Sequence, residues 1–79
     1  MIKLGDVISV TESDSTKQYM ITERLTDIGQ QEDEGGWLCI EMVALTKKGI
    51  DNITTFDCWR ITDRYLAVQI QRGVITIVN

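Results

Sequence analysis

The sequence predicts a mainly β fold, a small antiparallel barrel or roll of five to six strands. Within several short segments, apolar residues alternate with polar residues, which is typical of strands. Gly, Asp, Asn and Ser gather between these segments, as they do in turns. The chain has 79 residues, so we expect residues 1–79 to form a single small β domain. Short strands leave exposed edges that invite aggregation, and closure into a barrel removes those edges.

The first part of the chain contains two expected strands, residues 4–10 (LGDVISV) and 18–25 (QYMITERL). Because alternate residues of a strand share a face, one face of these strands gathers Leu4, Ile8, Val10, Tyr19, Ile21 and Leu25. The segment 26–36 (TDIGQQEDEGG) combines three consecutive acids with glycines, so we expect a mobile, solvated loop.

The central stretch, residues 37–61, carries both tryptophans, both cysteines and the one phenylalanine. Its two arms are rich in β-favouring residues, which predicts a hairpin. With Lys48 and Gly49 as a two-residue loop, residues pair where their numbers sum to 97. This register places Cys39 opposite Cys58, as a cross-strand thiol pair.

Two segments have a helical alternative. Residues 37–46 fit a strand, or a buried helix with lysines in its last turn and a glycine cap. Residues 63–72 fit the first arm of a second hairpin that continues into VITIV, or one short helix near the C-terminus that Thr62 caps and Gly73 ends.

The predicted hairpin has an apolar face and a mixed face. The apolar face, the better core, gathers Leu38, Ile40, Met42, Ala44, Ile53, Trp59 and Ile61. The mixed face has aromatic and apolar anchors among charges, as docking surfaces do. Its candidate protein-binding residues are Trp37, Val43, Phe56 and Arg60. The alternative is that the C-terminal hairpin covers this face inside the barrel.

The residue inventory argues against catalysis and against a bound cofactor or metal. The chain has no His, the usual general base and the commonest metal ligand. It contains no Gly-rich phosphate loop, no CxxC pair and no nucleophile elbow. The acidic run 32–34 lacks the spaced oxygen ligands of a calcium loop. We therefore expect a protein that is not an enzyme, with no catalytic, cofactor or metal site.

The charge distribution argues against direct nucleic-acid binding. Residues 1–34 carry eight acids against three bases, a net −5, whereas residues 35–79 carry four acids against five bases, a net +1. Phosphate backbones are bound by clustered Lys and Arg. The start MIKLGDV lacks the features of a signal peptide, and no apolar run approaches a membrane span. We expect a cytoplasmic protein with free thiols.

The opening GDVISV, the strand YMITE and the later WLCIEM resemble the small bacterial SH3-like barrel modules that begin with Gly-Asp-Val and carry a central tryptophan strand. The resemblance implies that fold and a binding-module role, and it implies no specific ligand. The long apolar strand and the VITIV tail depart from the family pattern.

Two functions remain as expectations. The first is a non-catalytic protein-binding module or subunit, which docks on a protein partner or on itself through an apolar aromatic face. The second is an acidic inhibitor, of the kind found in phages and mobile elements, that blocks a basic nucleic-acid-binding protein. Binding through charge weakens steeply with salt, and binding through an apolar face does not.

Overall fold

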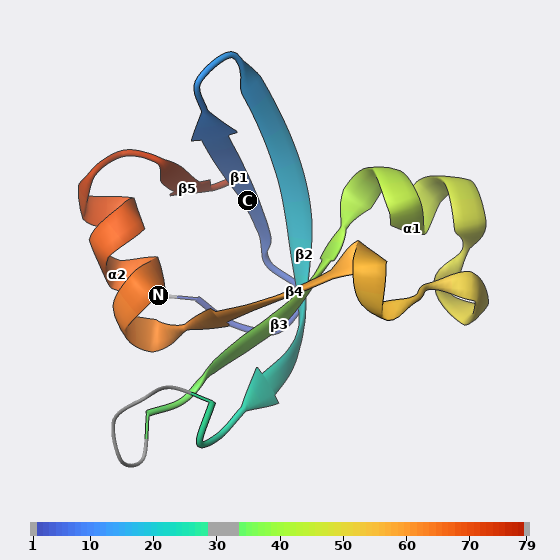
Figure 1. Cartoon of the computed structure of the whole chain (residues 1–79), viewed down its shortest axis with the longest axis horizontal. Coiled ribbons are helices and arrows are strands. Elements are labelled where there is room, and N and C mark those ends of the chain that lie inside the picture. The colour runs from blue at the N-terminus through green and yellow to red at the C-terminus, as the bar shows by residue number, and fades with distance from the viewer. Residues whose placement is uncertain (1, 29–33, 79) are drawn as a thin grey trace.

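The structure is a computed structural model that describes residues 2–28 and 34–78 of the chain (Figure 1). In chain order its elements are β1 (Val7–Glu12), β2 (Ser15–Leu25), β3 (Gly36–Glu41), α1 (Met42–Lys48), the 3₁₀ turns η1 (Ile50–Asn52) and η2 (Thr55–Asp57), β4 (Cys58–Thr62), α2 (Asp63–Gln71) and β5 (Ile75–Ile77). The strands form one open antiparallel sheet in the order β4-β3-β2-β1-β5. The prediction of a mainly β, antiparallel fold is confirmed.

A buried acid holds the start of the chain against the sheet. Asp6 is 2 % exposed, and its carboxylate accepts a hydrogen bond from the backbone N–H of Lys3 at 3.0 Å. The Lys3 ammonium lies 3.6 Å from this carboxylate, so the buried charge has a counterion. Gly5, at φ 90°, donates its N–H to the carbonyl of Ile21 at 2.8 Å. The predicted first strand therefore begins later, at Val7, because this turn precedes it.

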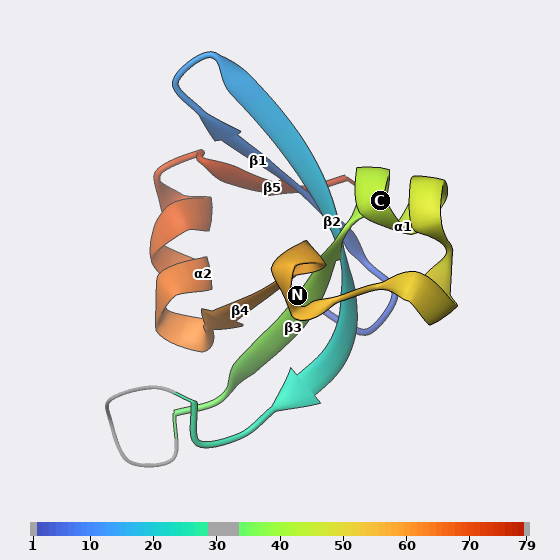
Figure 2. The ribbon, with the colours of Figure 1, turned by 45° about the vertical axis from the view of Figure 1, so that its right-hand side comes forward.

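Strand β2 lies inside the sheet, where it pairs on both edges, and it bends at a bulge. It pairs with β1 in a hairpin and with β3 on its other side. The register with β3 shifts between Ile21 and Glu23, which leaves Thr22 as the extra residue, and the Thr22 hydroxyl donates to the Leu38 carbonyl at 3.2 Å. A bulge bends a strand and increases its twist. Figures 1 and 2 show β2 curving across the molecule.

The predicted hairpin over 37–61 with a two-residue loop is wrong. β3 ends at Glu41, and α1, η1 and η2 intervene before β4. Of residues 37–46, the part up to Glu41 is the expected strand, and the part from Met42 on is the helical alternative. The helix α1, MVALTKK, has two lysines in its last turn and Gly49, at φ 80°, as its C-terminal cap. Cations and a glycine cap both favour the C-terminal end of a helix. These local signals override the continuous apolar run.

The register between β3 and β4 also differs by one residue. Partners have numbers that sum to 98, so Cys39 lies opposite Trp59, and Ile40 lies opposite Cys58. Since a shift of one residue turns every side chain of a strand to the other face, the two cysteines face opposite sides of the sheet. The predicted thiol pair is therefore wrong, and both cysteines are free.

Residues 63–72 form the helical alternative, so the second hairpin predicted there is wrong. The Thr62 hydroxyl accepts a hydrogen bond from the N–H of Tyr65 at 3.1 Å, and Gly73, at φ 80°, follows the helix. These caps decide the outcome, because the apolar residues that suggested a strand are mostly exposed on α2. The final strand expected in VITIV is present as β5, and it pairs with β1.

Helix α2 lies over one face of the sheet and connects its two edge strands (Figures 1 and 2). The hydrophobic core consists of Ile8, Val10, Ile21, Cys39, Ile61, Leu66 and Ile75. Within the described ranges, no helix is both long enough and apolar enough to cross a membrane.

The expected mobile loop over 26–36 falls partly outside the described residues, which exclude 29–33. Its mobility stays a prediction. Gly36 belongs to β3 and not to the loop, and a Cβ at this position would collide with the carbonyl oxygen of Ile61. Only glycine allows the two strands to approach this closely.

Thiol reactivity tests the register and the burial of the cysteines. Cys39 is 0 % exposed, and burial, with a further contribution from Cys58, raises the pKa of its thiol to about 12. Since the thiolate is the reactive form, we expect iodoacetamide at about pH 8 to label the folded protein at Cys58 alone, and to label both cysteines in urea. Mass spectrometry counts the labels. Rapid labelling of both thiols in the folded protein, or an intramolecular disulfide after mild oxidation, contradicts the structure.

Candidate functional site

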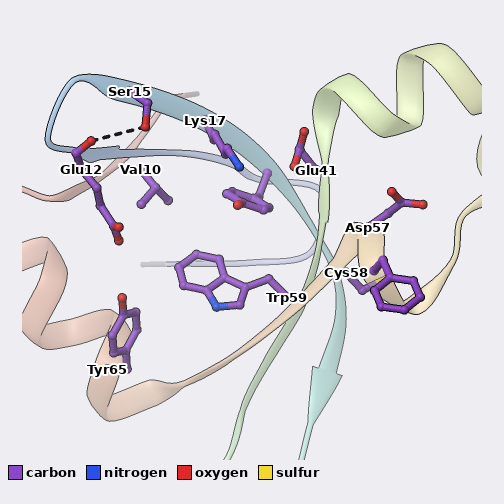
Figure 3. Close-up of a pocket in the computed structure, with 11 residues that line it drawn as sticks. Val10, Glu12, Ser15, Lys17, Glu41, Asp57, Cys58, Trp59 and Tyr65 are labelled. Atoms are coloured by element: carbon purple, nitrogen blue, oxygen red, sulfur yellow. Dashed lines mark hydrogen bonds between the residues drawn. The ribbon is translucent and has the colours of Figure 1, made fainter.

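The candidate site is a pocket of about 510 Å³ on the side of the sheet that α2 covers (Figure 3). The β1–β2 hairpin, the start of β4, the turn η2 and the first turn of α2 contribute to its wall. Its lining residues are Val10, Glu12, Ser15, Lys17, Tyr19, Glu41, Phe56, Asp57, Cys58, Trp59 and Tyr65. Four of the five aromatic residues of the chain line this one pocket.

Three of these residues, Tyr19, Trp59 and Tyr65, form an aromatic cluster. The ring centroids of Tyr19 and Trp59 are 5.1 Å apart at an interplanar angle of 46°. Those of Trp59 and Tyr65 are 5.8 Å apart and nearly perpendicular, at 82°. Both distances fall in the range where aromatic pairs attract. Because the rings come from β2, β4 and α2, the cluster joins three elements at the pocket.

Phe56 is held at the edge of the pocket with its side chain 97 % exposed. Its turn, η2, is fixed by a capping box in which the Asp57 carboxylate accepts the N–H of Thr54 at 2.9 Å. The same carboxylate binds the Lys48 ammonium at 2.9 and 3.1 Å, which ties η2 to the end of α1. An ordered turn thus presents a large apolar side chain to solvent. This is the exposed group that a partner has most to gain by covering.

The charges of the pocket are mostly acidic. Glu12, Glu41 and Asp57 stand against Lys17. Lys48 neutralises Asp57, and its hydrogen bond is the main reason that the pKa of this carboxyl is lowered. In the part of the chain that the structure describes, neither glutamate has an ion pair.

The same negative charges act on the phenol of Tyr19. Its pKa is raised, first by burial and then by the negative charges of Glu41, of Cys39 when ionised, and of Glu12. Repulsion by neighbouring anions disfavours the phenolate. The pocket therefore combines aromatic surfaces with a negative potential.

The residues predicted as the docking site do not share one face. Trp37 packs against the core, and Val43 lies exposed on α1, outside the lining of the pocket. Arg60 lines a second hollow of about 500 Å³, with Leu38, Thr55, Cys58 and Trp59. Of the four candidates, Phe56 alone lines the aromatic pocket. These residues do not form the predicted face, because that face depended on a hairpin and a register that the structure does not have.

The sequence reasoning missed Trp59, Tyr19 and Tyr65 as site residues. It placed Trp59 in the core, and the correct register does turn this residue inward, but at the edge of the core where the pocket opens. Tyr65 is the residue that the helical alternative would have identified, since a helix capped by Thr62 carries Tyr65 in its first turn beside the end of β4.

Trp37 belongs to a separate structural cluster. The guanidinium of Arg24 lies 4.7 Å above its ring and makes a bidentate ion pair with Asp63, with both N–O distances 2.7 Å. The cluster joins β2, β3 and the first turn of α2. It lowers the pKa of Asp63 and raises that of Arg24, in both cases chiefly through their mutual hydrogen bond. Stacking and bidentate pairing are both properties of Arg that Lys lacks.

No group of three or more His, Cys, Asp or Glu side chains within residues 2–28 and 34–78 is placed to hold a metal ion.

The pH dependence of stability tests the Arg24–Asp63 pair. The folded-state pKa of Asp63 is lowered, so its contribution is complete above the ordinary aspartate pKa of about 4 and is lost as pH falls through the folded value. Both side chains are nearly half exposed, so solvent screens the pair and we expect a small contribution to stability. Asp63→Asn should lower the free energy of unfolding near neutral pH and flatten its decline in acid, measured by urea denaturation.

The matched control is Asp14→Asn, which removes an exposed carboxylate without an ion pair among the described residues. It should leave the acid dependence as in the wild type. Parallel pH curves for the wild type and Asp63→Asn contradict the assignment.

Comparison of the chain with protein-family models, with curated proteins and with solved structures found no match.

Proposed function

We propose that this chain is a small, non-catalytic protein-binding module that docks through its aromatic pocket. The observation that carries the proposal is the concentration of four of the five aromatic side chains around one pocket, with Phe56 97 % exposed at its edge. Tyr, Trp and Phe are enriched in the buried centres of protein interfaces and supply most hot spots.

The volume of the pocket leaves room for a side chain that protrudes from a partner. A volume of about 510 Å³ is in the range of sites that enclose a few side chains. The wall combines the rings with carboxylates, a lysine and a serine, so polar groups are present to fix the orientation of the ligand. We therefore place the docking surface at this pocket and not on the hairpin face first expected.

We infer an SH3-like roll from the opening GDVISV, the tryptophan strand WLCIEM and the strand order β4-β3-β2-β1-β5. The bulge in β2 supports it, because barrels need strands that bend where the sheet turns. Helix α2 would then bring the two edge strands toward each other.

Phe56→Ala tests the proposed docking surface without disturbing the fold. An exposed side chain contributes little to stability, so the free energy of unfolding should change by no more than about 0.5 kcal/mol. Peptides selected on the wild type from a random 12-residue phage library serve as probes. We expect Phe56→Ala to raise their Kd at least about tenfold, the loss of a modest hot spot. Fluorescence anisotropy measures the change.

Leu4→Ala and Ile50→Ala are the matched controls. Both residues are exposed, at 59 % and 63 %, and neither lines the pocket. They should leave the Kd unchanged. Failure to select any peptide, or equal binding by Phe56→Ala and the wild type, contradicts the proposed function.

A further inference from the structure

An arginine that stacks on a tryptophan and pairs with a carboxylate is present elsewhere in the fold, and the pocket contains the same kinds of partner without the arginine. In the complete form, the guanidinium of Arg24 lies over the ring of Trp37 and is held there by the carboxylate of Asp63. A cation on an indole face, backed by a carboxylate, combines cation–π attraction with a charge-assisted hydrogen bond. The chain thus already uses this chemistry to join two strands and a helix.

The pocket repeats the tryptophan and the carboxylates without the arginine. Trp59 lines it together with Glu12 and Glu41, and no cation of the described residues lies over the Trp59 ring. In Figure 3 the side chain of Glu12 points from β1 toward the side of the pocket that Trp59 and Tyr65 form. Lys17 stands on the hairpin nearer to Glu41 (Figure 3).

The unpaired carboxylates of the pocket favour a positively charged ligand. Glu12 and Glu41 make no ion pair with a described residue, and Asp57 is already neutralised by Lys48. An acidic group of a ligand would be repelled by these carboxylates at close range, which weakens binding. A cation would form ion pairs with them. The net charge of the chain, −4, attracts basic partners over a longer range.

We propose that the pocket receives an arginine side chain from an extended, basic segment of the partner protein. The guanidinium would lie against the part of the Trp59 indole that stays exposed, beside Tyr65, and pair with Glu12, while apolar neighbours in the segment cover Phe56. This inference rests on the proposed function and names its ligand class. Arginine is preferred to lysine because its planar group both stacks on rings and binds carboxylates with two hydrogen bonds.

The first test uses the selected phage peptides, synthesised with arginine and with citrulline, which has the same shape and no charge. We expect the selected sequences to be enriched in arginine near an apolar residue. Replacement by citrulline should raise the Kd at least about fivefold, and replacement by lysine should raise it less. Isothermal titration calorimetry measures each Kd.

Variants of the protein locate the charge. Glu12→Gln should raise the Kd of the arginine peptide and leave the Kd of the citrulline peptide unchanged. The matched control Glu23→Gln makes the same chemical change at an exposed acid outside the pocket, and it should weaken neither peptide. Lys17→Gln removes the pocket's own cation and should strengthen the arginine peptide.

The outcomes separate this inference from the function on which it rests. If the citrulline peptide binds as tightly as the arginine peptide while Phe56→Ala still weakens both, the pocket docks peptides but the arginine inference is wrong. If Glu12→Gln and Glu23→Gln have the same effect, the proposed partner for the guanidinium is wrong. If Phe56→Ala leaves both peptides unaffected, the proposed function fails as well.

Discussion

The fold and its pocket depend on the packing of Trp59 between two tyrosines. The register of β4 against β3 turns this indole inward, opposite the buried Cys39. Tyr19 of β2 and Tyr65 of α2 then contact it from two sides, at centroid distances of 5.1 and 5.8 Å. This contact, together with the buried Leu66, holds α2 against the open sheet, and the same three rings form part of the wall of the pocket.

Two further features build the pocket around this cluster. The bulge at Thr22 bends β2, the strand that pairs with both β1 and β3, and so curves the sheet. The insertion between β3 and β4 supplies the rim, because the Lys48–Asp57 ion pair and the capping box fix η2 and hold Phe56 outward. The site we propose is thus assembled from parts that also stabilise the fold, and Phe56 is the exception, since its side chain contributes almost no burial.

The mainly β, antiparallel character of the fold was predictable from local patterns, and the site was not. Alternation and turn residues correctly indicated a mainly antiparallel sheet, with its first two strands close to their true positions and a last strand in VITIV. The assumed loop at Lys48-Gly49 was wrong because helix-ending signals in the same residues read equally well as a turn. That assumption shifted the predicted register by one residue, and so placed Trp37, and not Trp59, on the predicted docking face. In the structure the residues of that face lie on different surfaces. Phe56 survived because its exposure does not depend on strand pairing, whereas the contacts of Tyr19 and Tyr65 join distant segments that no local pattern specifies.

The most direct test of this account is the measurement of cross-strand nuclear Overhauser effects in the folded protein. The structure predicts backbone contacts between Cys39 and Trp59, together with contacts from the Trp59 indole to the rings of both Tyr19 and Tyr65. Backbone contacts that pair Cys39 with Cys58, with no contact between the indole and either tyrosine ring, would contradict it. That result would restore the alternative register and remove the aromatic pocket.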